Sequence, residues 1–161
     1  MINFLYIVST RENLCSSYYF QYVDKSDRAA LESDVVKKCV SARDSKCSFL
    51  EYKEYKIIHR QYNTLLFIVG TDEEENELAI YEFIQLFVEA LDKYFNTVNE
   101  QHLHEHQDTV RIILQGMIVN GYLVETNFNK IFSLLHMVER HGSAKKFIEQ
   151  TSAQVTKCLC L

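Results

Sequence analysis

Apolar residues along this chain follow two spacings, one typical of buried strands and the other of amphipathic helices. The run INFLYIV at 2–8 is short and rich in branched and aromatic residues, which predicts a strand buried on both faces. After the polar turn STREN, an aromatic run at 18–23 predicts a second strand. Further runs at 47–52, 55–62 and 64–70 are joined by very short polar connections, which favour antiparallel hairpins.

Helices are predicted where apolar residues recur at i+3 and i+4. One such helix spans about 25–42, with Asp24 as its N-cap. The acidic run at 72–77 begins a longer helix that ends near Val98. The wide apolar stripe of this helix indicates contact with the sheet and with a further element.

The chain is polar and irregular after Val98. Asp108 then begins another helix, for which Asn120-Gly121 is the predicted C-cap. A last amphipathic helix is predicted from Asn127 to near Gly142.

The element order predicts an α+β fold, in which helices pack on a five-stranded, mostly antiparallel sheet and further helices follow. We assign residues 1–142 to this domain. Residues 143–161 have weaker periodicity and are predicted to be a flexible tail.

Charge and cysteine content narrow the function classes. Seventeen basic against 22 acidic residues leave a net charge of −5, which argues against a nucleic-acid partner. The N-terminal apolar run stops at Val8 and has no basic residues before it, so no signal peptide is expected. The other apolar stretches are far shorter than the ~18 residues of a membrane span. Five cysteines, an odd number, fit a reducing compartment, and we predict a cytoplasmic protein.

Candidate catalytic residues are few, and the motifs GxGxxG, GxxxxGK[ST], HExxH and CxxC do not occur. On a strand, His102, His104 and His106 would share one face, as a zinc site requires. They lie between predicted helices, however, so we expect a solvated connection with no metal or other cofactor. Cys15 and His59 could form a thiol–imidazole pair, but burial explains an isolated cysteine more often than reactivity does. A metal-dependent hydrolase that uses the histidines is the enzymatic alternative.

The last four residues, CLCL, match the prenylation pattern C-a-a-X at Cys158. Lys145, Lys146 and Lys157 lie upstream and would favour an anionic membrane surface. The second "a" position is a cysteine rather than an aliphatic residue, so an unmodified tail is the alternative.

Longer strings of residues carry a family resemblance: MINFLYIV, FLEYKEYKIIHRQY, ENELAIYEFIQLFVEALDKYF and IVNGYLVETN. In a single register over residues 1–140, they resemble the small (sigma) subunits of the heterotetrameric clathrin-adaptor-type complexes, particularly those of the fourth adaptor complex. The resemblance implies a longin-like fold, in which a five-stranded antiparallel sheet carries helices on both faces.

The same resemblance implies a non-enzymatic role in a vesicle coat, without a cofactor. Such a subunit would bind two large subunits and one medium subunit. The complex would lie peripherally on trans-Golgi network or endosomal membranes and select cargo for intracellular protein transport. Within the long helix, we predict that Phe87 and Leu91 form the face that meets a partner subunit.

Some sigma subunits hold the leucines of an acidic dileucine signal, [DE]xxxL[LI], in an apolar pocket. The matching positions here are Leu65, Val88, Val98 and Leu103, and all four keep their apolar character. Burial of two leucines against them would supply binding energy, although ordinary core packing explains the same residues.

Three further positions depart from the pattern of the pocket-bearing subunits. Cys15 stands where they have a basic residue, Asn63 where they have a small apolar residue, and Thr97 where they have an asparagine. The resemblance therefore implies weak binding of dileucine cargo tails, with little dependence on the acidic residue of the signal.

The main alternative is a stand-alone longin-domain trafficking protein anchored by a prenyl group. Longin SNAREs carry a coiled-coil motif of several heptads after this domain, and the segment that follows residue 142 is too short for one.

Overall fold

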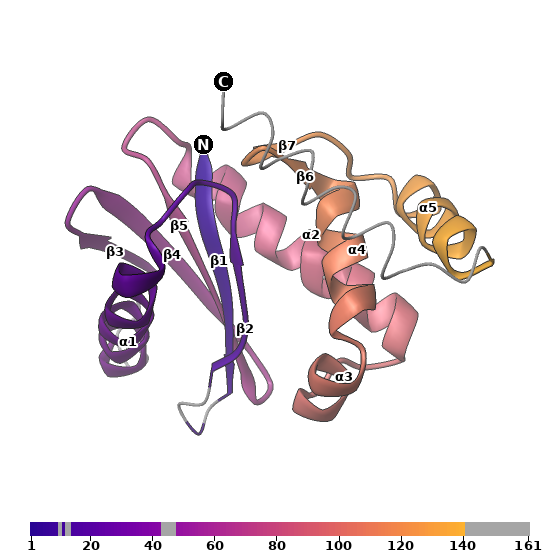
Figure 1. The fold of residues 1–161 in the computed structure, drawn as a ribbon, viewed down its shortest axis with the longest axis horizontal. Coiled ribbons are helices and arrows are strands. Elements are labelled where there is room, and N and C mark those ends of the chain that lie inside the picture. The colour runs from indigo at the N-terminus through magenta and orange to yellow at the C-terminus, as the bar shows by residue number, and fades with distance from the viewer. Residues whose placement is uncertain (10, 12–13, 43–47, 141–161) are drawn as a thin grey trace.

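A five-stranded antiparallel sheet is the centre of the computed structural model, which describes residues 1–9, 11, 14–42 and 48–140 (Figure 1). The strand order is β2-β1-β5-β4-β3. The strands are β1 (Ile2–Ser9), β2 (Leu14–Tyr19), β3 (Phe49–Tyr52), β4 (Tyr55–Tyr62) and β5 (Leu65–Thr71). The fold predicted from the sequence is confirmed.

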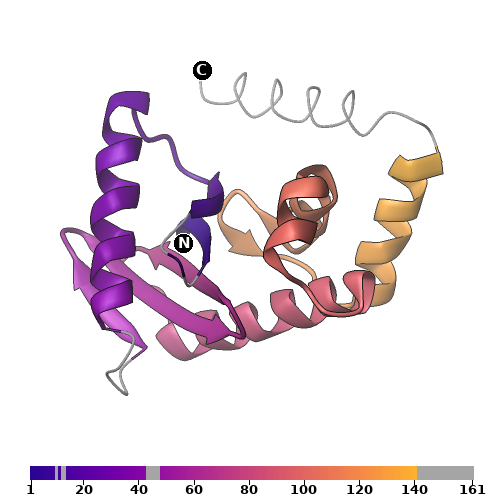
Figure 2. The same ribbon diagram turned by 90° about the horizontal axis from the view of Figure 1, so that it is seen from below.

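Helices cover both faces of this sheet (Figures 1 and 2). Helix α1 lies on one face, and the later helices lie on the other. The helices are α1 (Lys25–Ser41), α2 (Glu77–Phe95), α3 (Glu100–Glu105), α4 (Gln107–Met117) and α5 (Phe128–Arg140). No helix in the described part of the chain is both long and apolar enough to cross a membrane.

Strands β1 and β5 are buried on both faces, because side chains of a strand alternate between the two sides of a sheet. Leu5 and Ile7 belong to the apolar cluster that contains α2 and α4 residues. Phe4, Tyr6 and Val8 belong to the cluster that contains α1 residues. The predicted fully buried first strand is therefore confirmed, and the sheet separates two apolar layers.

The wide apolar stripe of α2 is explained by contacts on two sides. The helix packs on strand β4 of the sheet and against α4. The ring of Phe87 lies edge-on to that of Phe67 in β5, with 6.1 Å between centroids. Thus the further element predicted from the stripe lies within this chain.

The second strand lies earlier than predicted, at Leu14–Tyr19 rather than 18–23. Ser16 and Ser17 pair with β1 but gave no strand signal in the sequence. Strand β2 is an edge strand, and the side chains of Ser16 and Ser17 are only partly buried on the two faces, so polar residues are tolerated there.

Helix α2 begins later than predicted. Asn76 is its N-cap, and the Oδ1 atom accepts two N–H bonds of the first turn at 3.0 and 3.4 Å. Asp72 and Glu75 belong to the acidic run that was predicted to begin the helix, and they instead accept hydrogen bonds from the Met1 ammonium group. These two carboxylates thus hold the start of β1, while Glu77 of the same run lies in the first turn of α2.

The polar segment after α2 is helical rather than irregular. Helix α2 ends at Phe95, short of the predicted Val98, and Asn96 adopts a left-handed conformation with φ 57°. In α3, the Asn99 Oδ1 atom accepts the His102 N–H bond at 2.9 Å. Leu103 is fully buried and anchors this short helix.

Asn120 and Gly121 form the turn of a hairpin between β6 (Ile118–Val119) and β7 (Tyr122–Leu123), and they do not cap a helix as predicted. Their φ angles of 51° and 81° are both positive, as a type I′ turn requires. The Ile2 N–H group donates to the Gly121 carbonyl oxygen at 2.8 Å. A Cβ atom at Gly121 would lie 2.4 Å from the Ile2 oxygen, so no larger residue fits.

The helix predicted from Asn127 is confirmed as α5, and the Asn127 Oδ1 atom accepts the Asn129 N–H bond at 3.0 Å. Its predicted end near Gly142, the tail 143–161 and Cys158 lie outside the described residues, as does Cys47 at the start of the third predicted strand.

Candidate functional site

The predicted dileucine pocket maps to one end of the sheet, on the face that carries α2. Leu65 begins β5 opposite Ser9 of β1, and Cys15 lies on the neighbouring strand β2. Val88 comes from α2, and Val98 follows that helix. These residues and Leu103 of α3 belong to one apolar cluster, so the fold brings the predicted apolar set together.

The same residues are almost completely covered by the rest of the chain. The exposed fractions are 1% for Leu65, 3% for Val88, 5% for Val98 and 0% for Leu103. A leucine side chain of a ligand would have to displace packing that the isolated chain already has. In this conformation the four residues act as core.

Asn63 and Thr97 are exposed at the ends of the connections next to this cluster. Both have positive φ angles, 50° and 126°. The Asn63 carbonyl oxygen accepts a hydrogen bond from the Gln61 side chain at 3.1 Å. The Thr97 carbonyl oxygen lies 3.2 Å from Nδ1 of His102. These two positions therefore define turns at the rim rather than contacts inside the cluster.

Cys15 supplies no positive charge to this end of the sheet. Burial raises the pKa of its thiol, and the nearby carboxylate of Glu100 raises that pKa further, while a hydrogen bond with the Ser9 backbone opposes both effects. The thiol therefore stays protonated at neutral pH. The nearby charge is negative, which is the wrong sign for an acidic signal residue.

The three histidines do not share one face, because His102 and His104 lie at helical spacing in α3 and His106 is the C-cap of that helix. The rings of His102 and His106 lie on Phe95, with centroid distances of 5.1 and 5.5 Å. His104 is exposed. Within residues 1–9, 11, 14–42 and 48–140, no group of three His, Cys, Asp or Glu side chains could hold a metal ion.

Cys15 and His59 lie on opposite faces of the sheet. Cys15 belongs to the cluster on the α2 side. His59 pairs with Ile68, which belongs to the cluster on the α1 side, and it follows Ile58 of the α2 side. The two groups therefore cannot act as a nucleophile and its base.

Comparison with known proteins agrees with this architecture. Residues 1–142 match the family model of the clathrin adaptor complex small chain. The chain belongs to this family. It is 44% identical over 140 residues to the human AP-4 complex subunit sigma-1, which covers 87% of this chain and 97% of the human protein.

Other small chains are similar over nearly the same span. The Arabidopsis thaliana AP-4 complex subunit sigma is 38% identical over 139 residues, which covers 86% of this chain and 97% of the plant protein. The Schizosaccharomyces pombe AP-1 complex subunit sigma-1 is 32% identical over 132 residues and covers 82% of each chain.

A solved structure with the same fold is a chain in a homology model of the full-length AP-3 complex in a stretched open conformation. The TM-score is 0.68 at 26% identity, and the match covers 98% of this chain and 99% of that chain. The longin-like fold expected for a small chain is thus present over the whole described structure.

The predicted partner face of this small chain is wrong for Phe87 and Leu91. Both side chains are 0% exposed and lie in the cluster between α2 and the sheet. The apolar pattern of this helix in the sequence cannot distinguish residues that face the chain's own sheet from residues that face a partner. These two residues face the sheet and the neighbouring helices.

The exposed apolar side chains of the small chain lie elsewhere. Val119, Tyr122, Leu123 and Val124 are between 44% and 58% exposed, and all lie in or next to the β6–β7 hairpin. This surface is not predicted when Asn120-Gly121 is taken as a helix cap. The signal was available, since Asn-Gly between apolar residues is typical of a two-residue hairpin.

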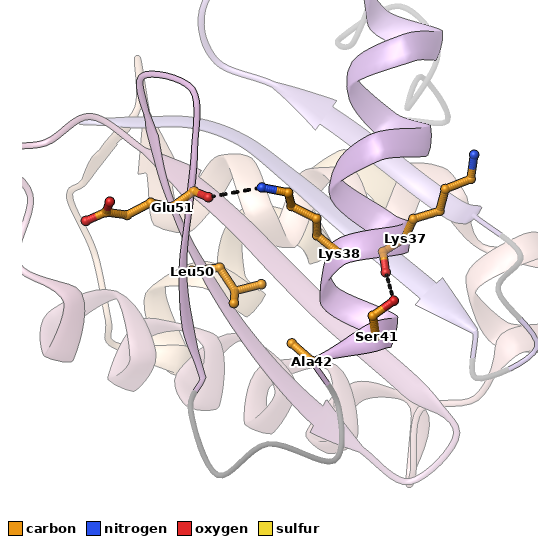
Figure 3. A pocket seen from close by; sticks show the side chains of 6 residues that line it. All are labelled: Lys37, Lys38, Ser41, Ala42, Leu50 and Glu51. Carbon is orange, nitrogen blue, oxygen red and sulfur yellow. Dashed lines mark hydrogen bonds between the residues drawn. The ribbon is translucent and has the colours of Figure 1, made fainter.

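A shallow groove of about 470 Å³ lies on the other side of the sheet, between α1 and the edge strand β3 (Figure 3). Lys38 Nζ donates to the Glu51 carbonyl oxygen at 3.5 Å, and the Ser41 hydroxyl donates to the Lys37 carbonyl oxygen at 2.8 Å. None of the residues predicted for a site lines this groove.

Proposed function

We propose that this chain is the small subunit of an AP-4-type adaptor complex. The observation that carries the proposal is the 44% identity to the human AP-4 complex subunit sigma-1 over 97% of that protein. The identity to the AP-1 small chain is lower, at 32%. Similarity of this extent covers the sheet, α2 and the β6–β7 hairpin together, rather than one motif.

In this proposal the chain binds two large subunits and one medium subunit. It stabilises the core of the complex and contributes to the selection of cargo. The complex lies on the cytoplasmic side of trans-Golgi network or endosomal membranes and reaches them peripherally. The chain itself carries out no catalysis and needs no cofactor.

Affinity purification tests this proposal. The full chain, tagged and expressed in cells of its source, should recover two large subunits and one medium subunit of one adaptor complex. Quantitative mass spectrometry should find these three in amounts comparable to the chain. Recovery of the subunits of a different adaptor complex would contradict the AP-4 type, and recovery of none would contradict the subunit role.

We also propose that dileucine cargo tails bind weakly to the cluster of Leu65, Val88, Val98 and Leu103. Binding requires the cluster to open, since each of these side chains is at most 5% exposed. The neutral thiol of Cys15 and the carboxylate of Glu100 offer no cation to an acidic signal residue. Affinity should then come from apolar burial, at roughly 1.5–3 kcal/mol for each leucine before the cost of opening.

Titration of peptides on the assembled complex measures this affinity and its dependence on the acidic residue of the signal. We expect an ExxxLL peptide and its AxxxLL counterpart to bind with dissociation constants within about threefold of each other, which is less than 1 kcal/mol. The ExxxAA peptide, the matched control, should not bind. A tenfold loss for AxxxLL that disappears at high salt would contradict the proposal, because it requires a cation near the signal.

A further inference from the structure

The Met1 ammonium group is held between two carboxylates from a distant part of the chain. Its nitrogen donates to Asp72 Oδ2 at 2.9 Å and to Glu75 Oε2 at 2.5 Å. Both carboxylates belong to the connection from β5 to α2, 71 and 74 residues further along the chain. We call the ammonium group and these two carboxylates the ammonium clamp.

Backbone hydrogen bonds fix the ammonium clamp in position. The Asp72 N–H group donates to the Met1 carbonyl oxygen at 3.2 Å, and the Ile2 N–H group donates to the Gly121 carbonyl oxygen at 2.8 Å. Ile2 is 1% exposed and begins β1 in the core. The clamp therefore ties the start of β1 to the β5–α2 connection.

The ammonium group alone balances the charge of the two carboxylates. Within the described residues, no Lys, Arg or His side chain forms an ion pair with Asp72 or Glu75. The second oxygen of Asp72, Oδ1, is buried and has no hydrogen-bond partner in this part of the chain. Loss of the positive charge would leave two like charges close together, because both carboxylates contact the same nitrogen.

The clamp also opposes reaction of the amine. An amine attacks a carbonyl carbon only in its neutral form, which has a free lone pair. Burial lowers the pKa of the Met1 amine, but the hydrogen bonds and charges of Glu75 and Asp72 outweigh this effect, so the pKa lies above its ordinary value. Met1 is partly exposed, so a small reagent can reach the amine. Its protection then comes from the clamp rather than from complete burial.

We propose that the Met1 α-amino group is an acetylation-sensitive site, which the clamp keeps unmodified in the folded chain and whose acetylation before folding weakens the attachment of β1. The donor would be an acetyl thioester. The ammonium group first releases a proton to water, and the neutral amine then attacks the thioester carbonyl carbon. An N–C bond replaces the C–S bond, and a second amine proton passes to the leaving thiol. The amide that forms is uncharged and cannot balance the two carboxylates.

Rates of acetylation test the protection. The folded full chain is treated with N-hydroxysuccinimidyl acetate, and mass spectrometry of the N-terminal peptide follows the reaction at Met1. The double variant Asp72→Asn, Glu75→Gln should react at least about threefold faster than the wild type. The matched control Glu73→Gln, Glu74→Gln removes two charges at exposed positions of the same acidic run and should react as slowly as the wild type. Circular dichroism verifies that each chain is folded.

A second comparison needs no variant. The wild type should react at Met1 at least about threefold faster in urea, where the clamp is lost, than in the folded state. Equal rates in the wild type, the double variant and the control, or equal rates with and without urea, would show that the clamp does not protect the amine.

Chains that differ only in the acetyl group test the effect on the fold. A thioester peptide of residues 1–14, with a free or an acetylated Met1, can be ligated to residues 15–161, which begin with the cysteine that the ligation requires. The acetylated wild type should unfold at a lower urea concentration than the free chain. In the double variant, acetylation should cause no such shift, because the interaction that it removes is already absent. The control should show the shift of the wild type.

Two further results would overturn the proposal. Equal urea midpoints for the free and acetylated wild type would show that the clamp does not stabilise the fold. An acetyl group on Met1 in the intact mass of the affinity-purified chain would show that the assembled protein uses the modified form. Neither result bears on the proposed function, which depends on the subunits that the chain recovers.

Discussion

His59 is a buried imidazole on the α1 side of the sheet. It is 5% exposed, and its Nε2 atom has no hydrogen-bond partner within the described residues. Burial lowers the pKa of His59, so the folded protein holds the neutral form. In the unfolded chain the same group has a pKa of about 6.5. Between these two pKa values the unfolded state binds more protons than the native state.

Acidification should therefore destabilise the protein through His59. Stability is fully present above pH 6.5 and falls as the pH drops toward the lowered pKa of the folded state. We expect the wild type to lose more of its free energy of unfolding than His59→Leu does when the pH changes from 7 to 5. Urea unfolding at both pH values measures the difference.

His104→Leu is the control for this experiment, since His104 is exposed. This variant should keep the pH dependence of the wild type. An equal pH dependence in the wild type and in His59→Leu would show that another group causes the acid sensitivity.

The candidate pocket shows which features of a site can be predicted from residue type alone. Leu65, Val88, Val98 and Leu103 were predicted to lie together, and they belong to one apolar cluster. Residue type left open whether they receive a ligand or pack as core. Helix α3, which contacts β2 and contributes Leu103 to the cluster, begins at the Asn99 cap in a segment that has no apolar periodicity.

At the scale of elements, α2 is the centre of the larger apolar layer. Phe87 lies against Phe67 in the sheet and stacks on Phe83 of its own helix, with centroid distances of 6.1 Å in both pairs. Because Phe87 is fully buried, its removal leaves a cavity between helix and sheet.

Phe87→Ala should lower the free energy of unfolding by about 3–5 kcal/mol. Urea unfolding of the purified chain measures this change. The control Leu78→Ala, at an exposed position of the same helix, should stay within about 0.5 kcal/mol of the wild type. A Phe87→Ala chain that keeps wild-type stability but no longer recovers its partners would restore the original assignment of Phe87 to a partner face.

The elements that sequence could predict are those with a strong apolar period. Strand β4 has the predicted bounds, and α1 differs from its prediction by one residue at its end. Edge strand β2 was misplaced because Ser16 and Ser17 interrupt its apolar run, and helix α3 was missed because Leu103 is its one apolar residue. The position of β2 is determined by its pairing with β1. Helix α3 is held by its Asn99 cap and by the buried Leu103. Such tertiary contacts leave little periodic signal in the sequence.

At the scale of the whole molecule, the chain buries its own helices and leaves a rigid apolar hairpin at one end. Burial on both faces of the sheet accounts for the fold of this small chain. Val119, Tyr122, Leu123 and Val124 of the β6–β7 hairpin segment stay exposed in the isolated chain. We therefore regard the assembled complex, rather than the isolated chain, as the state in which this protein functions.

Native mass spectrometry of the affinity-purified assembly tests this claim most directly. The account predicts one particle whose mass equals the sum of one copy of this chain, two different large subunits and one medium subunit. Dissociation in the gas phase should release this chain as a single copy. The account is contradicted if the purified chain appears alone, as a homo-oligomer, or in an assembly without adaptor subunits.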